Sequence, residues 1–271
     1  MSIELLQAHY GFTRMPFGRG LAPQMLHRSA GHLEAVARIG WCIQESALGV
    51  ITGEVGSGKT VATRAATTAL DNSRNTLIYL GNPAIGARGI YHGIVTALGG
   101  VPRFHKASLI PQTVDLLAAE ENERGKRVVV AIDEAHLLTP DQLEEIRLLT
   151  NSELDSKSSF SCLLVGQPTL RRRIKLGMFA ALDQRITLRY TMPPHTETET
   201  TNYINHHLKI AGRTDTLFTD DATTLIHQAS RGLPRAINNL AIQALIATYT
   251  TKKAIVDETS TRTAINEITA D

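Results

Sequence analysis

The sequence of 271 residues contains only two cysteines, and both of them, Cys42 and Cys162, lie inside apolar stretches. Two thiols of this kind argue against a disulfide framework and favour a reducing compartment. The N-terminal segment has no uninterrupted apolar core of the sort found in secretory signals. No segment approaches the roughly 18 consecutive apolar residues that a membrane-spanning helix needs. We therefore expect a cytoplasmic protein with no membrane partner.

The sequence also lacks a strong excess of charge, because 28 Lys and Arg are balanced by 26 Asp and Glu to give a net charge of +2. This balance excludes a chain that is strongly basic throughout, as many nucleic-acid-binding proteins are. Basic residues are enriched at the start, where residues 1–110 carry ten Lys and Arg against five Asp and Glu. This bias fits the binding of polyphosphate or DNA, and a solvated surface explains it nearly as well.

Apolar residues come in short runs that alternate with longer amphipathic segments, a pattern typical of parallel strands connected by helices. The short runs predict strands at 47–53, 76–83, 127–136, 159–168 and 185–192. The amphipathic segments predict helices at 61–70, 87–98, 108–126 and 139–151. Beyond residue 193 only helical periodicity remains, over 197–211, 219–229, 234–250 and 257–269. We therefore expect an α/β domain over residues 1–192 and a small all-helical domain over residues 193–271.

Residues 53–60, GEVGSGKT, lie between a predicted strand and a predicted helix and match the pattern G-x-x-x-x-G-K-[ST]. Glycines permit backbone conformations in which successive N–H groups face one anion, and the following helix adds its N-terminal dipole. We expect Lys59 to neutralise the β- and γ-phosphates of ATP and the Thr60 hydroxyl to coordinate Mg²⁺. The alternative is a glycine-rich turn with a chance Lys-Thr pair. The predicted nucleotide contacts in this segment are Gly53, Glu54, Val55, Gly56, Ser57, Gly58, Lys59, Thr60 and Val61.

A second motif, VVVAIDEAH, is a hydrophobic strand that ends in two carboxylates, Asp133 and Glu134. Downstream of a phosphate loop, Asp133 is expected to hold Mg²⁺ and Glu134 to polarise the attacking water. Taken alone, the pair could also be a solvated or helix-capping acidic pair. Together with the phosphate loop it predicts hydrolysis of ATP with Mg²⁺ as the metal cofactor.

Three polar residues follow these motifs at informative positions. Gln167 comes after the fourth predicted strand, where its amide could reach the γ-phosphate or the attacking water, although a turn residue before Pro168 is equally compatible. Arg185 precedes the fifth strand, from which an arginine could reach the nucleotide of a neighbouring subunit; an ordinary surface arginine is the alternative. Arg235 begins a helix of the small domain and could report the nucleotide state to that domain.

These residues together resemble an AAA+ ATPase. GEVGSGKT resembles its Walker A motif, VVVAIDEAH its Walker B motif, and GLPRAINNL its sensor 2, with Gln167 at the position of sensor 1. The resemblance implies a P-loop NTPase fold with a parallel sheet flanked by helices, followed by a small helical lid domain. Sensor 1 in this family is often Asn, Ser or Thr, so Gln167 departs from the pattern.

A closer resemblance links the chain to the ExeA-like group, through HYGFTRMPF, LHRSAGHLEAVARI and LLVGQPTLRRRI followed by LDQRI. This resemblance implies that Leu26, His27 and Arg28 lie beside the adenine. It also implies that Arg185 is an arginine finger.

The ExeA-like group has two known uses. One is a stand-alone cytoplasmic helper of DDE transposases, akin to TnsC, TniB and IstB, and the other is an ExeA/GspA-like ATPase of type II secretion or envelope assembly that does not bind DNA. The sequence carries no membrane segment after its helical part, so we expect the helper form. The alternative remains the secretion ATPase.

Helpers of this kind assemble with ATP as homo-oligomers, either rings or filaments, on duplex DNA that they grip through its backbone without sequence specificity. The resemblance points to the helix after the second strand as the DNA-contacting region. The candidate DNA contacts that flank this helix are Arg88, Arg103 and Lys106, for which a solvated basic face is the alternative. A denser basic cluster, RRRIK at 171–175, fits an intersubunit or structural role at least as well as DNA contact.

Overall fold

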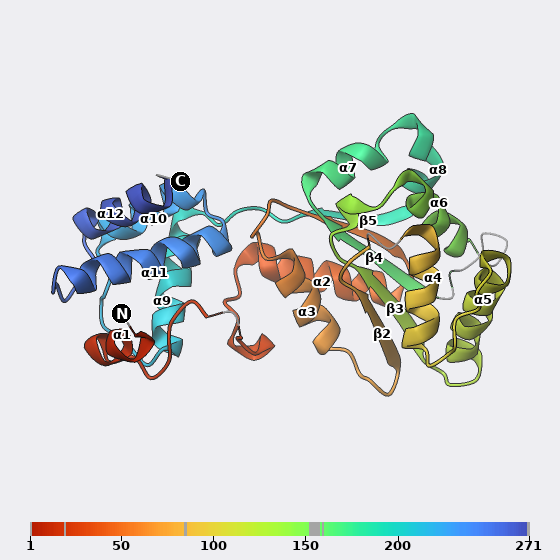
Figure 1. Cartoon of the computed structure of the whole chain (residues 1–271), viewed down its shortest axis with the longest axis horizontal. Helices are drawn as coiled ribbons and strands as arrows, with labels where there is room; N and C mark the ends of the chain where they lie inside the picture. The colour runs from red at the N-terminus through yellow and green to blue at the C-terminus, as the bar shows by residue number, and fades with distance from the viewer. Residues whose placement is uncertain (1, 19, 84–85, 152–157, 159, 270–271) are drawn as a thin grey trace. The chain divides into compact units, whose positions relative to one another are not determined.

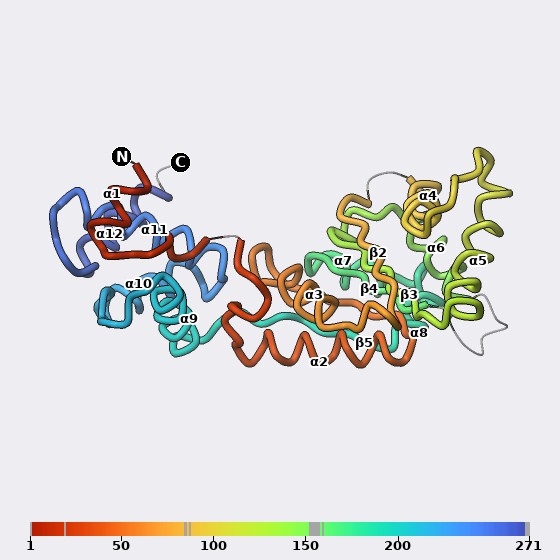
Figure 2. Tube along the Cα trace, turned by 90° about the horizontal axis from the view of Figure 1, so that it is seen from below, coloured from red at the N-terminus to blue at the C-terminus, as the bar shows by residue number. Residues whose placement is uncertain are grey.

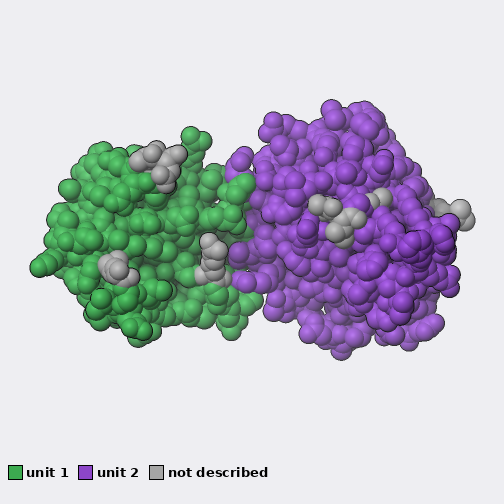
Figure 3. Space-filling view, viewed as in Figure 1, with its two compact units in different colours: residues 1–32, 55–58, 193–271 green, residues 33–54, 59–192 purple. Residues whose placement is uncertain are grey.

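The computed structural model describes residues 2–18, 20–83, 86–151, 158 and 160–269 of the chain. The chain forms two compact units, coloured separately in Figure 3. Unit 1 comprises residues 1–32, 55–58 and 193–271, and unit 2 comprises residues 33–54 and 59–192.

Unit 2 is built on a sheet of five strands in the order β2-β3-β4-β1-β5, in which every neighbouring pair is parallel. This arrangement confirms the predicted α/β fold class with a parallel sheet. The strand that precedes Asp133 and Glu134 ends at Ile132, earlier than the predicted residue 136, because the backbone turns at Glu134. The strands are β1 (Leu48–Thr52), β2 (Asn75–Leu80), β3 (Arg127–Ile132), β4 (Phe160–Gly166) and β5 (Ile186–Thr191).

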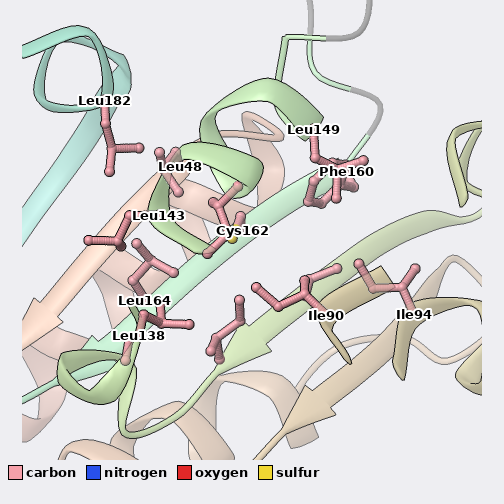
Figure 4. Close-up of a cluster of buried hydrophobic side chains, with 14 of the residues drawn as sticks. Leu48, Ile90, Ile94, Leu138, Leu143, Leu149, Phe160, Cys162, Leu164 and Leu182 are labelled. Atoms are coloured by element: carbon pink, nitrogen blue, oxygen red, sulfur yellow. The ribbon is translucent and has the colours of Figure 1, made fainter. Parts of the chain in front are cut away.

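Helices cover both faces of this sheet, as Figure 1 shows, because alternate residues of the buried strands point to opposite faces. Val128 and Val130 of β3 enter the larger core, part of which is drawn in Figure 4, whereas Val129 enters the core on the other face. The helices over the larger core are α4 (Gly86–Ala97), α5 (Lys106–Asn122), α6 (Pro140–Leu149), α7 (Pro168–Ile174) and α8 (Ala180–Arg185), and those over the other face are α2 (Ala30–Gln44) and α3 (Lys59–Thr68).

The start of α6 follows local sequence rules closely. Thr139 is the N-cap and accepts a hydrogen bond from the backbone N–H of Gln142, whose own side chain returns to the backbone of Thr139, while Pro140 occupies the first turn. The helix lies after the short 3₁₀ helix η2 (Ala135–Leu137). Capping therefore fixes where the chain resumes a helix after the acidic pair at the end of β3.

Unit 1 is helical and includes the N-terminal residues, a difference from the expected domain over 1–192. Leu6, Tyr10, Phe12 and Phe17 share one buried core with residues of the C-terminal helices, and the Tyr10 hydroxyl donates a hydrogen bond to the Leu245 carbonyl over 2.7 Å. The division at 192/193 coincides with a unit limit. The helices of this unit are α1 (Ile3–Tyr10), η1 (Pro23–Met25), α9 (Glu197–Ile210), α10 (Asp220–Ser230), α11 (Pro234–Thr250) and α12 (Glu258–Thr269).

The helices of both units pack around buried apolar clusters. Within the described parts of the chain, none of them combines the length and apolar character needed to cross a membrane.

Candidate nucleotide-binding site

The glycine loop runs from the end of β1 to the first residue of α3. Gly56 and Gly58 have φ values of 81° and 92°, which are accessible to glycine without the steric cost that a Cβ brings. The Lys59 ammonium donates hydrogen bonds to the carbonyls of Gly53 and Glu54, each over 2.9 Å. The lysine charge is therefore held against its own loop, at the start of the helix that follows it.

Thr60 and Asp133 meet at the carboxyl ends of the strands. The Thr60 hydroxyl donates to Asp133 Oδ2 over 2.8 Å, and the Asp133 residue is only 6% exposed. Neutral hydroxyl and carboxylate oxygens are the hard ligands that Mg²⁺ prefers. This donor set fits the Mg²⁺ ion that the motifs imply, and Thr60 and Asp133 are the residues that would hold it.

Glu134 is set apart from Asp133 by its backbone. It adopts a left-handed conformation, with φ 50° and ψ 32°, and its N–H donates to Asp133 Oδ1 over 2.8 Å. A non-glycine residue in this region costs on the order of 1–3 kcal/mol, and such residues cluster at active sites. The Glu134 side chain is 53% exposed and its Oε2 lies 3.4 Å from His136 Nδ1. One carboxylate is thus buried for metal binding, while the other is accessible to water.

A residue that the sequence analysis missed, Tyr79, also contacts Asp133. Its hydroxyl donates to Asp133 Oδ2 over 2.8 Å, so this oxygen accepts from both Thr60 and Tyr79. Burial, followed by this hydrogen bond to the carboxylate, raises the pKa of Tyr79 to about 12. The available signal is its place near the end of β2, which pairs with β3 so that Tyr79 lies opposite Ala131. Tyr79 is therefore a positioning residue for the Asp133 carboxylate.

Replacing Tyr79 with Phe is expected to raise the Mg²⁺ concentration that gives half-maximal ATPase activity about tenfold. The Asp133 carboxylate loses a charge-assisted hydrogen bond worth about 1.5 kcal/mol, so it is no longer held in one orientation. A Mg²⁺ titration at saturating ATP measures the shift. The matched control is Tyr91→Phe, which removes a hydroxyl bonded to Glu145. An unchanged Mg²⁺ dependence in Tyr79→Phe would show that Tyr79 does not position Asp133.

Gln167 and Arg185 lie at the ends of elements in unit 2. Gln167 follows β4, which pairs directly with β1, the strand that precedes the glycine loop. It is the N-cap of α7, and its side chain makes no capping hydrogen bond. Arg185 ends α8 and donates from Nη1 to the Thr150 carbonyl over 3.2 Å and from Nη2 to Asn151 Oδ1. The Arg185 guanidinium is therefore anchored to the chain that follows α6.

Arg235 lies in the first turn of α11. Both Arg235 and the loop residue Gly56 belong to unit 1. The backbone N–H of Arg235 donates to the Gly56 carbonyl over 3.2 Å. A Cβ placed at Gly56 would lie 2.7 Å from the Arg235 Cβ, closer than such atoms approach. The absence of a side chain at Gly56 thus permits the contact with Arg235.

Leu26, His27 and Arg28 follow η1, also in unit 1. The His27 ring lies 5.3 Å from that of His206 and 5.6 Å from that of Tyr203. Burial is the main cause that lowers the pKa of His27 to about 4, and nearby histidines add to the effect. His27 is therefore neutral near pH 7 and packs beside the rings of His206 and Tyr203. Arg28 is exposed and Leu26 is partly buried.

The candidate DNA contacts occur around the connection between α4 and α5. Arg88 Nη2 donates to the Arg103 carbonyl over 3.2 Å, so these two residues are brought together. Lys106 forms an ion pair with Glu145, which also accepts a hydrogen bond from Tyr91. The ion pair offsets the charge of Lys106, and the exposed Arg88 and Arg103 carry most of the local positive charge.

The basic cluster at 171–175 is engaged within its own unit. Arg171 donates to Thr191 Oγ1 over 3.2 Å, and Lys175 lies 3.5 Å from the Asp183 carboxylate. Arg173 donates to the Leu138 carbonyl. These contacts tie α7 to its neighbours and fit the structural role considered for the cluster.

Known proteins resemble the chain in its motifs and its fold. The model of the AAA domain family matches residues 43–174, which include the glycine loop, Asp133 and Glu134. Cdc6p from Pyrobaculum aerophilum superposes with a TM-score of 0.69 at 16% identity, over 93% of this chain and 70% of that one. The chain has an AAA+ fold.

The AAA+ fold is shared with proteins that differ widely in sequence. The Aeropyrum pernix ORC1 protein, solved in complex with DNA, matches with a TM-score of 0.65 at 14% identity, over 90% of this chain and 67% of that one. General secretion pathway protein A of Aeromonas hydrophila is 33% identical over 244 residues, which are 89% of this chain and 44% of that protein. The chain thus spans less than half the length of this curated relative.

Proposed function

We propose that the chain binds and hydrolyses ATP with Mg²⁺ and uses this cycle to assemble as a homo-oligomer on duplex DNA, where it recruits or regulates a DDE transposase in the cytoplasm. One observation supports the ATPase part of the proposal. The Thr60 hydroxyl is bonded to Asp133, and the exposed Glu134 follows Asp133 directly after β3. The AAA+ fold supports nucleotide hydrolysis. The roles of duplex DNA and of the transposase as partners go beyond this observation.

Each site residue has one task in this proposal. Lys59 neutralises phosphate charge, Thr60 and Asp133 hold Mg²⁺, and Glu134 accepts a proton from the attacking water. Mg²⁺, when bound, screens the negative charge that develops on the phosphates. The roles proposed outside the loop are Leu26, His27 and Arg28 beside the base, Gln167 toward the γ-phosphate or the attacking water, Arg235 as the residue that reports the nucleotide state to the helical domain, and Arg185 as a finger toward a neighbouring subunit.

The support for DNA as a partner comes from the surface between α4 and α5 and from fold relatives. Arg88 and Arg103 are both exposed, and the Arg88 guanidinium donates a hydrogen bond to the Arg103 main-chain carbonyl, so two basic residues lie near each other. Two proteins with this fold, the Aeropyrum pernix ORC1 protein and Drosophila ORC, were solved with DNA. Contacts to phosphates add little sequence information, so the proposed grip on DNA is nonspecific.

Replacing both Arg88 and Arg103 with Glu is expected to weaken ATP-dependent duplex binding at least tenfold. It is also expected to make the duplex affinity less dependent on salt concentration. Each lost phosphate contact lowers the slope of log affinity against log salt by about 0.9. Fluorescence anisotropy of a labelled duplex over a series of salt concentrations measures both quantities. The matched control is Arg74→Glu, an arginine whose side chain is 84% exposed. If the variant and the control lose the same affinity for the duplex, Arg88 and Arg103 do not contact the DNA.

A second candidate function is favoured by one specific observation, the 33% identity to general secretion pathway protein A. In this case the ATPase cycle drives envelope assembly or secretion, and no DNA is bound. A gene for a DDE integrase beside the gene of this chain supports the helper role, whereas neighbouring secretin or pilus genes support secretion. A chain that retains no duplex at low salt, with ATP or with a non-hydrolysable analogue, would favour the second candidate.

A further inference from the structure

The connection between α4 and α5 is held in a defined conformation. The Gln112 side chain accepts a hydrogen bond from the Arg103 N–H over 3.0 Å and donates one to the Val101 carbonyl over 2.9 Å. Arg88 of α4 adds a third bond, to the Arg103 carbonyl. The connection, yellow in Figure 2, lies at the periphery of unit 2. Side chains on both flanking helices therefore fix this segment.

The same segment presents apolar side chains to solvent. Val101 is 86% exposed and Phe104 is 79% exposed, more than the other large apolar residues that are exposed in the described part of the chain. The Phe104 ring lies 5.5 Å from the Arg88 guanidinium and 5.1 Å from the His105 ring. An exposed aromatic ring is thus set among basic groups on a preformed segment.

We propose that Phe104 is a wedge that inserts between base pairs of duplex DNA from the minor groove, while Arg88 and Arg103 contact the flanking phosphates. This inference rests on the proposed function, and it adds a side chain that contacts the bases. An apolar wedge flanked by cations is a recurring arrangement in proteins that bind and bend DNA through the minor groove. The cations favour a polyanion over an apolar protein surface as the occupant, because a protein groove for Phe104 would not require them.

A single-tryptophan reporter tests the wedge directly. The chain has one tryptophan, Trp41, which is 45% exposed, so Trp41→Phe combined with Phe104→Trp places the only tryptophan in the segment. Stacking of an indole on bases quenches its fluorescence. On addition of ATP and an unlabelled duplex we expect emission from the introduced tryptophan to fall at least twofold. Anisotropy of a labelled duplex, measured in parallel, reports binding itself.

Two further variants separate the wedge from general apolar contact. Phe104→Ala is expected to weaken duplex binding at least fivefold, whereas Met178→Ala, which removes another side chain that is 69% exposed, is expected to leave it unchanged. Duplex binding with undiminished tryptophan emission and an unaltered affinity of Phe104→Ala would overturn the wedge and leave the DNA-binding proposal intact. No duplex binding by any form would overturn both proposals.

Discussion

Replacing Glu134 with Gln is expected to reduce the ATPase turnover by about 10²–10⁴-fold and to leave ATP binding unchanged. General-base catalysis by a positioned carboxylate contributes this much, and an amide cannot accept the proton of the attacking water. Gln has nearly the same shape, so the left-handed backbone and the bond from its N–H to Asp133 are retained. Phosphate release at saturating ATP measures turnover, and equilibrium binding of a fluorescent ATP analogue measures affinity.

The matched control for this variant is Glu144→Gln. Glu144 is also about half exposed but is paired with Arg147 on α6, and its loss should leave turnover unchanged. If Glu134→Gln hydrolyses ATP at the wild-type rate, Glu134 is not the general base.

Replacing Lys59 with Ala is expected to weaken ATP binding about 10²-fold. The ammonium group forms charge-assisted bonds to phosphate worth about 3 kcal/mol, and alanine offers none. The fold should persist, because the bonds from Lys59 to the carbonyls of Gly53 and Glu54 lie within its own loop and not in a hydrophobic core. Isothermal titration with a non-hydrolysable analogue gives the affinity, and thermal unfolding without nucleotide reports the fold.

Lys175→Ala serves as the control for the loss of a lysine, since Lys175 is paired with Asp183. This variant should bind the analogue as the wild type does. Wild-type affinity in Lys59→Ala would mean that the glycine loop does not bind the phosphates through its lysine. A large loss of thermal stability would instead indicate a structural role for Lys59.

Most of the sheet could be predicted from the sequence, because its strands are short apolar runs. The five predicted strands all occur, and the capping signals at Thr139 and Pro140 locate the start of α6. The helices α1, α2, α7 and α8 were not predicted. The α1 contacts bring Leu6 and Tyr10 to a core formed by residues near the other end of the chain, a pairing that no local pattern contains.

The motif residues of the site could be predicted because phosphate and Mg²⁺ chemistry demands particular side chains at fixed spacings. The Thr60–Asp133 hydrogen bond brings two of these motif residues together, and their Mg²⁺ binding stays a prediction. Tyr79 could not be found in this way, since its role depends on strand pairing that the sequence alone does not give. The pairing of Lys106 with Glu145 likewise depends on tertiary packing, and it alters the charge available to DNA.

The central claim is that ATP drives assembly of this chain on duplex DNA. Sedimentation velocity of the full chain with a fluorescent duplex, in ATP with Mg²⁺, in ADP with Mg²⁺ and without nucleotide, tests it most directly. The account predicts complexes that contain several protomers per duplex in ATP, with fewer or none in the other two conditions. A chain that hydrolyses ATP normally yet never sediments with the duplex at low salt would contradict it.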